Sequence, residues 1–223
     1  MVRPRKEEQT DLSQAIRSAA WELIARQGPA ALSLRAIARD LQITAPAIYN
    51  YFPDRDALVT ALIVEAYTSF SDTLAAALLP LPPQAHAARV RALGAAYREW
   101  AVQFPERFQL VFGTPLAGYT APAELTMPAA SRGLGLLAGV LADAHAAGRL
   151  LTAHLEPPSP ELARMLALWQ ADPEVIYLTL TLWAAVQGLV SLEVGRQFPP
   201  QISDPAPLFQ RALDTLVAQT IAA

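Results

Sequence analysis

The chain has 223 residues, enough for one large or two small domains with a hydrophobic core, and 53% of them are hydrophobic. Its net charge is −3, yet eight of its 17 basic and only seven of its 20 acidic residues lie in the first 60 positions, so the start of the chain is its more basic part. The absence of cysteine excludes disulfides and thiol chemistry, and the first residues lack the apolar run of a secretory signal.

The first predicted element is a helix from about Asp11 to Gln27, followed by the stop signal Gly28-Pro29. Its apolar stripe consists of Leu12, Ile16, Ala19, Leu23 and Ile24. A basic tail precedes it, with Arg3, Arg5 and Lys6. Such tails follow a DNA backbone or enter a minor groove, and an unstructured, solvated start explains this one equally well.

Two short helices are predicted between residues 32 and 58. Ser33 can cap the first of them, whose apolar face consists of Leu34, Ile37, Ala38 and Leu41. Residues 42–44 form a tight break, and Thr44 can cap a second helix from Ala45 to Tyr51. Pro46 is acceptable in its first turn, where the N–H has no helical partner. This layout is typical of a helix-turn-helix, whose second helix enters the DNA major groove.

The second of these helices has the composition of a groove-reading element. Its leading turn is small, which lets it approach base edges, and it offers hydroxyl and amide groups. Ile48 and Phe52, four residues apart, can anchor it to a core. The alternative is a surface helical hairpin with incidental tyrosines. The predicted DNA contacts are Arg35, Thr44, Ala45, Pro46, Ala47, Tyr49, Asn50, Tyr51 and Arg55.

Helical periodicity dominates the remaining chain, and prolines separate the segments. Asp54 caps a long helix that reaches the break at 80–83. Further helices are predicted at about 84–104, from Pro105 past Phe112, and at 129–147, 161–170, 173–197 and 205–221, with a loop from Gly113 to Pro128. The prediction is an all-α protein with a DNA-binding domain at 1–58 and a ligand-binding and dimerisation domain at 59–223.

Residues 175–192 form an uncharged run long enough to cross a membrane. It contains Thr179 and Gln187, and no basic cluster stands beside it, so we expect a soluble helix and no membrane contact. A helix that is apolar nearly all round is usually buried on two sides. We expect those sides to face its own domain and a second subunit, so that the last two helices form a homodimer.

Aromatic residues of the second half are candidates for a small-molecule cavity. Tyr97, Trp100, Phe104 and Phe108 recur at helical spacing on either side of Pro105. Ligand cavities are mostly apolar with a few convergent polar groups, which favours a small apolar or amphipathic effector. The alternative for each aromatic residue is a packed core. The predicted ligand residues are Tyr97, Trp100, Phe104, Phe108, Phe112, Tyr119, Trp169, Tyr177, Trp183 and Gln187.

Catalysis finds little support in the sequence. His86, His145 and His154 are isolated, and no zinc-protease, hydrolase or phosphate-loop spacing is present. Each histidine is interpreted as a surface or helix-end residue. We therefore expect no enzyme activity, no metal site and no cofactor.

The first 60 residues resemble the TetR family of transcriptional regulators, with every spacing kept over about residues 11–60. The matching positions are Ile16, Ala19, Leu23, Gly28, Ile37, Ala38, Leu41, Ile43, Ile48, Tyr49, Phe52, Arg55 and Leu58. Two positions depart from the pattern. Gln42 stands where the turn usually has glycine, so its backbone angle should be less comfortable. Arg55 stands where lysine is usual, and it still supplies a cation for phosphate.

The later runs AAYREWAVQFPERFQLVFG and LTLWAAVQGLVSLEVGRQF resemble the ligand-binding domain of a TetR subgroup with a Trp-His-Gly pattern. Trp183 and Gly188 keep their places, and Gln187 replaces the histidine. The resemblance implies a cytoplasmic, homodimeric repressor that leaves a palindromic, double-stranded DNA operator when an effector binds. The alternative is a helical small-molecule carrier or enzyme whose head no longer reads DNA.

Overall fold

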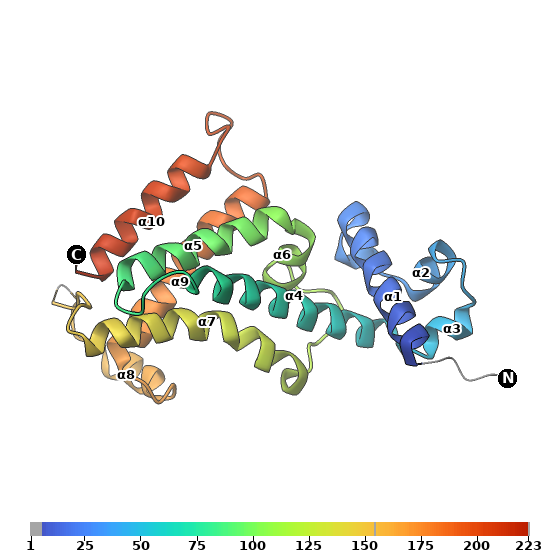
Figure 1. The fold of residues 1–223 in the computed structure, drawn as a ribbon, viewed down its shortest axis with the longest axis horizontal. Helices are drawn as coiled ribbons and strands as arrows, with labels where there is room; N and C mark the ends of the chain where they lie inside the picture. The colour runs from blue at the N-terminus through green and yellow to red at the C-terminus, as the bar shows by residue number, and fades with distance from the viewer. Residues whose placement is uncertain (1–5, 154, 223) are drawn as a thin grey trace. The chain divides into compact units, whose positions relative to one another are not determined.

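The computed structural model describes residues 6–153 and 155–222, and their regular structure is helical apart from one isolated bridge between Leu150 and Ile221 (Figure 1). Arg3, Arg5 and His154 lie outside the described residues. The elements are α1 (Lys6–Gln27), η1 (Pro29–Ala31), α2 (Leu34–Asp40), α3 (Ala45–Tyr49), α4 (Arg55–Leu78), α5 (His86–Gln103), α6 (Pro105–Phe112), α7 (Ala123–Ala146), α8 (Pro160–Ala167), α9 (Pro173–Val194) and α10 (Ala206–Thr220).

The chain divides into two compact units. The first contains the residues up to Thr68 together with 104–129, and the second contains 69–103 together with 130–223. The long helices α4 and α7 contribute to both. The domain boundary expected after Leu58 falls in the first turns of α4.

In the first unit, α1, α2 and α3 enclose a small apolar core. Ile16, Ile37 and Ile48 are fully buried, which places the predicted apolar faces of the three helices against one another. Gly28 ends α1 as predicted: its φ is 80°, and its N–H donates to the carbonyl of Ile24 at 2.7 Å. A side chain rarely adopts this left-handed angle, so glycine suits the position.

Two of the predicted boundaries that differ from the structure involve proline. The loop expected as far as Pro128 ends earlier, because α7 begins at Ala123 and contains Pro128. Its first turn starts where the carbonyl of Pro122 accepts the N–H groups of Leu125 and Thr126, at 3.1 and 3.0 Å. In contrast, α3 ends two residues before the predicted Tyr51. Pro53 follows closely, and the residue ahead of a proline is disfavoured in helical conformation.

The second unit is built around aromatic rings and close helix contacts. Here α5 packs against α9 and α10 (Figure 1). The Phe70 ring meets those of Tyr97 and Trp100 edge-on, with centroids 5.0 Å apart in both pairs. Gly94 and Gly133 allow close approach, since an added Cβ would lie 2.6 Å from Leu213 and Phe70 respectively.

Helices α7 and α9 are long and apolar enough to cross a membrane by length and composition alone. Core helices of soluble proteins pass the same test, so this is weak support for a membrane span. Both contribute to the packed core, α7 through Val140 and Leu141 and α9 through Leu182 and Val190.

Candidate nucleic-acid interface and internal cavity

The helix-turn-helix forms where the sequence predicts it. The Ser33 hydroxyl caps α2 by accepting the N–H of Ala36 at 3.5 Å. The turn to α3 passes through Gln42 at a φ of 55°. This angle is the left-handed conformation expected from the glycine that the family pattern has there, and it is strained for a residue with a side chain. The prediction that Gln42 has an unfavourable backbone angle is confirmed.

On α3 and its flanks, the predicted contact residues separate into an exposed group and an anchored group. Tyr49 is 43% exposed, and Thr44, Pro46 and Asn50 are also exposed. Ala45 begins the helix, and Ala47 is half-buried. Tyr51 lies beyond the helix end and is half-buried, which makes it a weaker candidate for DNA contact than Tyr49. The buried Ile48 and Phe52 anchor the helix as predicted.

The two basic residues among the predicted DNA contacts lie on the neighbouring helices. Arg35 is exposed on α2, and Arg55 is the first residue of α4. The Nη1 atom of Arg55 lies 3.8 Å from Asp56 Oδ1, a separation that leaves the guanidinium weakly held. Asp54 caps α4 as predicted, because its Oδ1 accepts the N–H of Ala57 at 2.7 Å.

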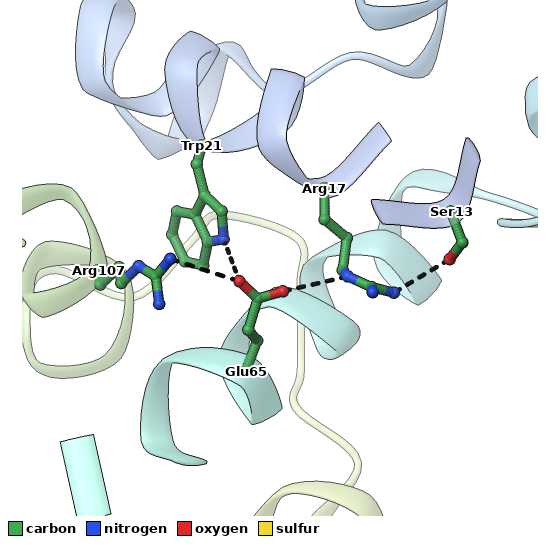
Figure 2. Close-up of polar contacts among 5 residues, drawn as sticks. All are labelled: Ser13, Arg17, Trp21, Glu65 and Arg107. Atoms are coloured by element: carbon green, nitrogen blue, oxygen red, sulfur yellow. Dashed lines mark hydrogen bonds and ion pairs between the residues drawn. The ribbon is translucent and has the colours of Figure 1, made fainter. Parts of the chain in front are cut away.

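Glu65 on α4 connects three elements of the first unit (Figure 2). Its carboxylate accepts the indole N–H of Trp21 at 2.9 Å and lies 3.1 Å from Arg17 Nε, both from α1. From α6, Arg107 Nη2 lies 3.5 Å from the same carboxylate. The Arg107 guanidinium also lies over the rings of Trp21 and Phe104, at 5.1 and 4.8 Å. Sequence reasoning missed this cluster, because partners so far apart along the chain leave no local pattern.

The segment that follows α6 is also held to α4. The Thr60 hydroxyl donates to the carbonyl of Asp56 at 2.8 Å, so the Tyr119 hydroxyl, 2.9 Å away, is the donor to Thr60. Tyr67 donates to the carbonyl of Val111 at 3.2 Å, and burial raises its pKa. Together with Glu65, these bonds attach α6 and its loop to the helices that carry the helix-turn-helix.

Replacing Glu65 with alanine should lower the free energy of unfolding by about 2 kcal/mol, because hydrogen bonds to charged groups contribute about 1.5–3 kcal/mol each and this site is partly solvated. Chemical denaturation measures the change. The matched control is Asp72→Ala on the same helix, since Asp72 forms an exposed pair with Arg132 at 2.9 Å. That variant should lose less than about 1 kcal/mol. Equal losses would show that the Glu65 cluster has no special role.

The second unit contains a small cavity of about 30 Å³ among α4, α5, α7, α9 and α10. The side chains around it are apolar apart from the Tyr97 hydroxyl and the Trp183 N–H, so it suits a neutral, apolar group. The lining residues are Leu74, Val90, Leu93, Gly94, Tyr97, Gly133, Leu137, Leu182, Trp183, Val186 and Leu213.

The structure does not bring the predicted ligand residues into one place. Tyr97 and Trp183 line the cavity. The residues Phe104, Phe108, Phe112 and Tyr119 belong to the first unit. The remaining aromatic candidates are not in the cavity lining: Trp100 is 1% exposed, while Trp169 and Tyr177 are 52% and 40% exposed.

Gln187 and Arg98, two polar residues of the second unit, have clear partners. The Trp183 Nε1–H donates to the Oε1 atom of Gln187 at 3.0 Å, one helical turn along α9. Arg98 forms a bidentate pair with Glu193, at 2.7 and 2.5 Å, and this hydrogen-bonded carboxylate raises the Arg98 pKa.

The aromatic candidates could be listed from the sequence, but their division between the two units depends on long-range packing.

His145, Asp172 and Glu174 are exposed residues that the sequence reasoning did not group, and their ligand atoms lie within 4.8 Å of one another. Asp172 is the N-cap of α9, where its Oδ1 accepts the N–H groups of Glu174 and Val175. Helix capping accounts for this carboxylate, and acids are favoured in the first turn of any helix.

Comparisons with known proteins agree with this arrangement. Residues 16–62 match the family described as bacterial regulatory proteins, tetR family, and residues 90–216 match a tetracyclin repressor-like C-terminal domain. The HTH-type transcriptional regulator Rv1816 of Mycobacterium tuberculosis is 36% identical over 197 residues, which cover 86% of this chain and 84% of that protein.

Solved structures share the fold. The crystal structure of SCO4313, described as a regulatory protein, has a TM-score of 0.79 at 32% identity, covering 97% of this chain and 100% of that one. FadR of Bacillus subtilis, solved in complex with stearoyl-CoA, has a TM-score of 0.65 at 17% identity, covering 92% and 98%. The chain therefore belongs to the TetR family and is a DNA-binding transcriptional regulator with an N-terminal helix-turn-helix and a helical C-terminal domain.

Proposed function

We propose that this regulator is a cytoplasmic, homodimeric repressor that binds a palindromic operator and leaves it when a small apolar or amphipathic molecule binds. The exposed polar face of α3, with Thr44, Tyr49 and Asn50, is the observation that carries the DNA-reading part. Phosphate contacts come from Arg35 and Arg55, which flank α3 in the chain. Residues on the small leading turn, Pro46 among them, approach the base edges.

The effector site is the cavity of the second unit. Its lining carries no charged side chain, so a buried charged group would lose its hydration without gaining a partner. The part of the effector that enters must therefore be neutral. FadR with stearoyl-CoA and TetR of Acinetobacter baumannii with minocycline, both of the same fold, were solved with bound small molecules.

The dimer forms through the exposed face of α9 together with α10. Tyr177, Leu180, Ala184 and Leu192 recur along this face at spacings of three, four and eight residues, and all are exposed. An apolar stripe of this kind on a long helix is suited to a two-fold, helix-on-helix interface. On α10, Phe209 is buried in its own subunit, so the apolar contact on that helix comes from Leu208.

Release follows from dimer geometry. A dimeric helix-turn-helix protein binds two half-sites about 34–36 Å apart, or a multiple of that distance. Effector binding that favours a dimer with a different separation weakens specific binding. Such coupling is typically about 1–3 kcal/mol, and it is reciprocal, so operator DNA weakens effector binding by the same factor.

Tyr49→Ala should weaken binding to the specific operator by about 1–3 kcal/mol and leave nonspecific binding unchanged, because a base-edge contact carries sequence information. Arg55→Ala should weaken binding to all sequences alike and reduce the salt dependence by about one phosphate contact. Gel-shift titrations at several salt concentrations, using the DNA upstream of its own gene, measure both.

Glu22→Ala, an exposed position on α1, serves as the control and should bind like the wild type. If both Tyr49→Ala and Arg55→Ala stay folded and keep wild-type operator affinity, α3 does not read the operator. If the wild-type protein itself shows no specific binding to any upstream region, the carrier or enzyme alternative replaces the repressor.

A further inference from the structure

The cavity of the second unit has one wall that differs from the others. Ten of its eleven lining residues are buried, and only Trp183 is half-buried. Trp183 is therefore the lining residue at which the cavity comes nearest to the surface of the unit. Any molecule that enters from this side must displace the Trp183 ring.

Ring packing and a hydrogen bond both hold the Trp183 indole. It packs edge-on against Phe70 and Tyr97, with centroids 5.9 and 5.3 Å away. Its Nε1–H donates to Gln187 Oε1 at 3.0 Å. Gln187 is half-buried and lies next to the exposed face of α9. The apolar packing can be replaced by an apolar guest, whereas the hydrogen bond cannot. Breaking that bond leaves the indole N–H to water.

We propose that Trp183 is the gate of the effector cavity and that Gln187 is the latch that holds it closed. This inference rests on the proposed effector role of the cavity. Gln187 acts as a positioning residue: it touches the gate and not the guest. It holds the indole across the cavity mouth, and a neutral, apolar molecule enters when that hydrogen bond opens.

The size of the effect follows from the strength of one hydrogen bond. The loss of one such bond changes the ratio of the closed to the open position of the Trp183 ring about fivefold. Gln187→Leu should therefore raise the open fraction of the gate, and the entry rate of a guest, by about fivefold. Gln187→Glu keeps an acceptor oxygen and should remain close to wild type. In a Trp183→Phe background, which lacks the N–H, Gln187→Leu should have no further effect.

Two measurements on the full-length dimer test the latch. Fluorine NMR of protein labelled with 5-fluorotryptophan, with a soluble nitroxide as broadening agent, reports the exposure of each indole without a ligand. The Trp183 signal should broaden more in Gln187→Leu, while that of the buried Trp100 should not change. Stopped-flow mixing with N-phenyl-1-naphthylamine, a neutral apolar fluorophore, measures the entry rate. Gln84→Leu, an exposed residue ahead of α5, controls for the change in composition.

The outcomes separate the two ideas. A Gln187→Leu dimer that is folded, with an unchanged Trp183 signal or an unchanged entry rate, overturns the latch. So does an equal acceleration in the Trp183→Phe background, because the effect would then not pass through the indole N–H. If the fluorophore binds neither the wild type nor any variant, the cavity is not an apolar ligand site, and the gate falls together with the effector site.

Discussion

Replacing Trp100 with alanine should lower the free energy of unfolding by about 3–5 kcal/mol, the range for deleting a large buried aromatic side chain. Trp100 is 1% exposed, and its indole N–H donates to the Ser69 hydroxyl at 3.1 Å. Its ring also packs edge-on against Phe70, with centroids 5.0 Å apart. The substitution leaves a void among rigid neighbours and removes a hydrogen bond.

The sequence also allowed a ligand role for Trp100, in which the alanine variant would stay folded and lose only its response to the effector. Trp100 is not among the residues around the cavity, which favours the core role. Urea denaturation decides between the two. Trp169→Ala is the control, because Trp169 is 52% exposed and its loss should cost less than about 1 kcal/mol. A Trp100→Ala protein as stable as wild type would contradict the core role.

The DNA-binding head could be predicted from the sequence because its determinants are local. The spacing of Ile37, Ile48 and Phe52 fixes which faces are buried, and Ser33 and Asp54 cap the helices that follow them. Each of these signals acts within one helical turn. Such signals survive in the linear order of residues, so the pattern and the fold agree.

The cavity and the links around α4 could not be predicted in the same way. Phe108 and Trp183 are both aromatic candidates in the sequence, yet Phe108 packs in the first unit and Trp183 lines the cavity of the second. In the sequence, Glu65 looks like an ordinary solvent-exposed helix residue. Only the folded chain brings Arg17 and Arg107 to it. Long-range packing decides these cases, and periodicity describes only the element that carries each residue.

Pro128 illustrates a different failure. Proline predicts a helix boundary because it lacks an N–H and collides with the preceding turn. Here α7 begins only five residues earlier, at Ala123, so few helical bonds precede the proline. The carbonyl of Pro122 starts the helix by accepting two N–H groups. The general rule for proline is sound, but its consequence depends on where the helix begins.

Replacing Leu180 with aspartate should convert the proposed dimer to monomers at micromolar concentration. Leu180 is 36% exposed on the apolar face of α9, so the subunit should tolerate the change. In a two-fold interface the same position occurs twice, and two carboxylates enter one apolar patch without a partner. A dimer that binds both half-sites at once can have an affinity about 10²–10⁴ times higher than one subunit alone. Loss of the dimer removes this gain.

Sedimentation velocity and gel-shift titration measure these two effects, and operator affinity should fall by at least about 100-fold. Leu79→Asp is the matched control, since Leu79 is 85% exposed at the end of α4 and away from α9 and α10 in the chain. It makes the same chemical change and should leave both assembly and operator affinity intact. A Leu180→Asp protein that sediments as a dimer and binds the operator like wild type would show that the exposed face of α9 is not the interface. The two subunits would then have to meet through another surface, and the recognition helices would be spaced by contacts other than those of the last two helices.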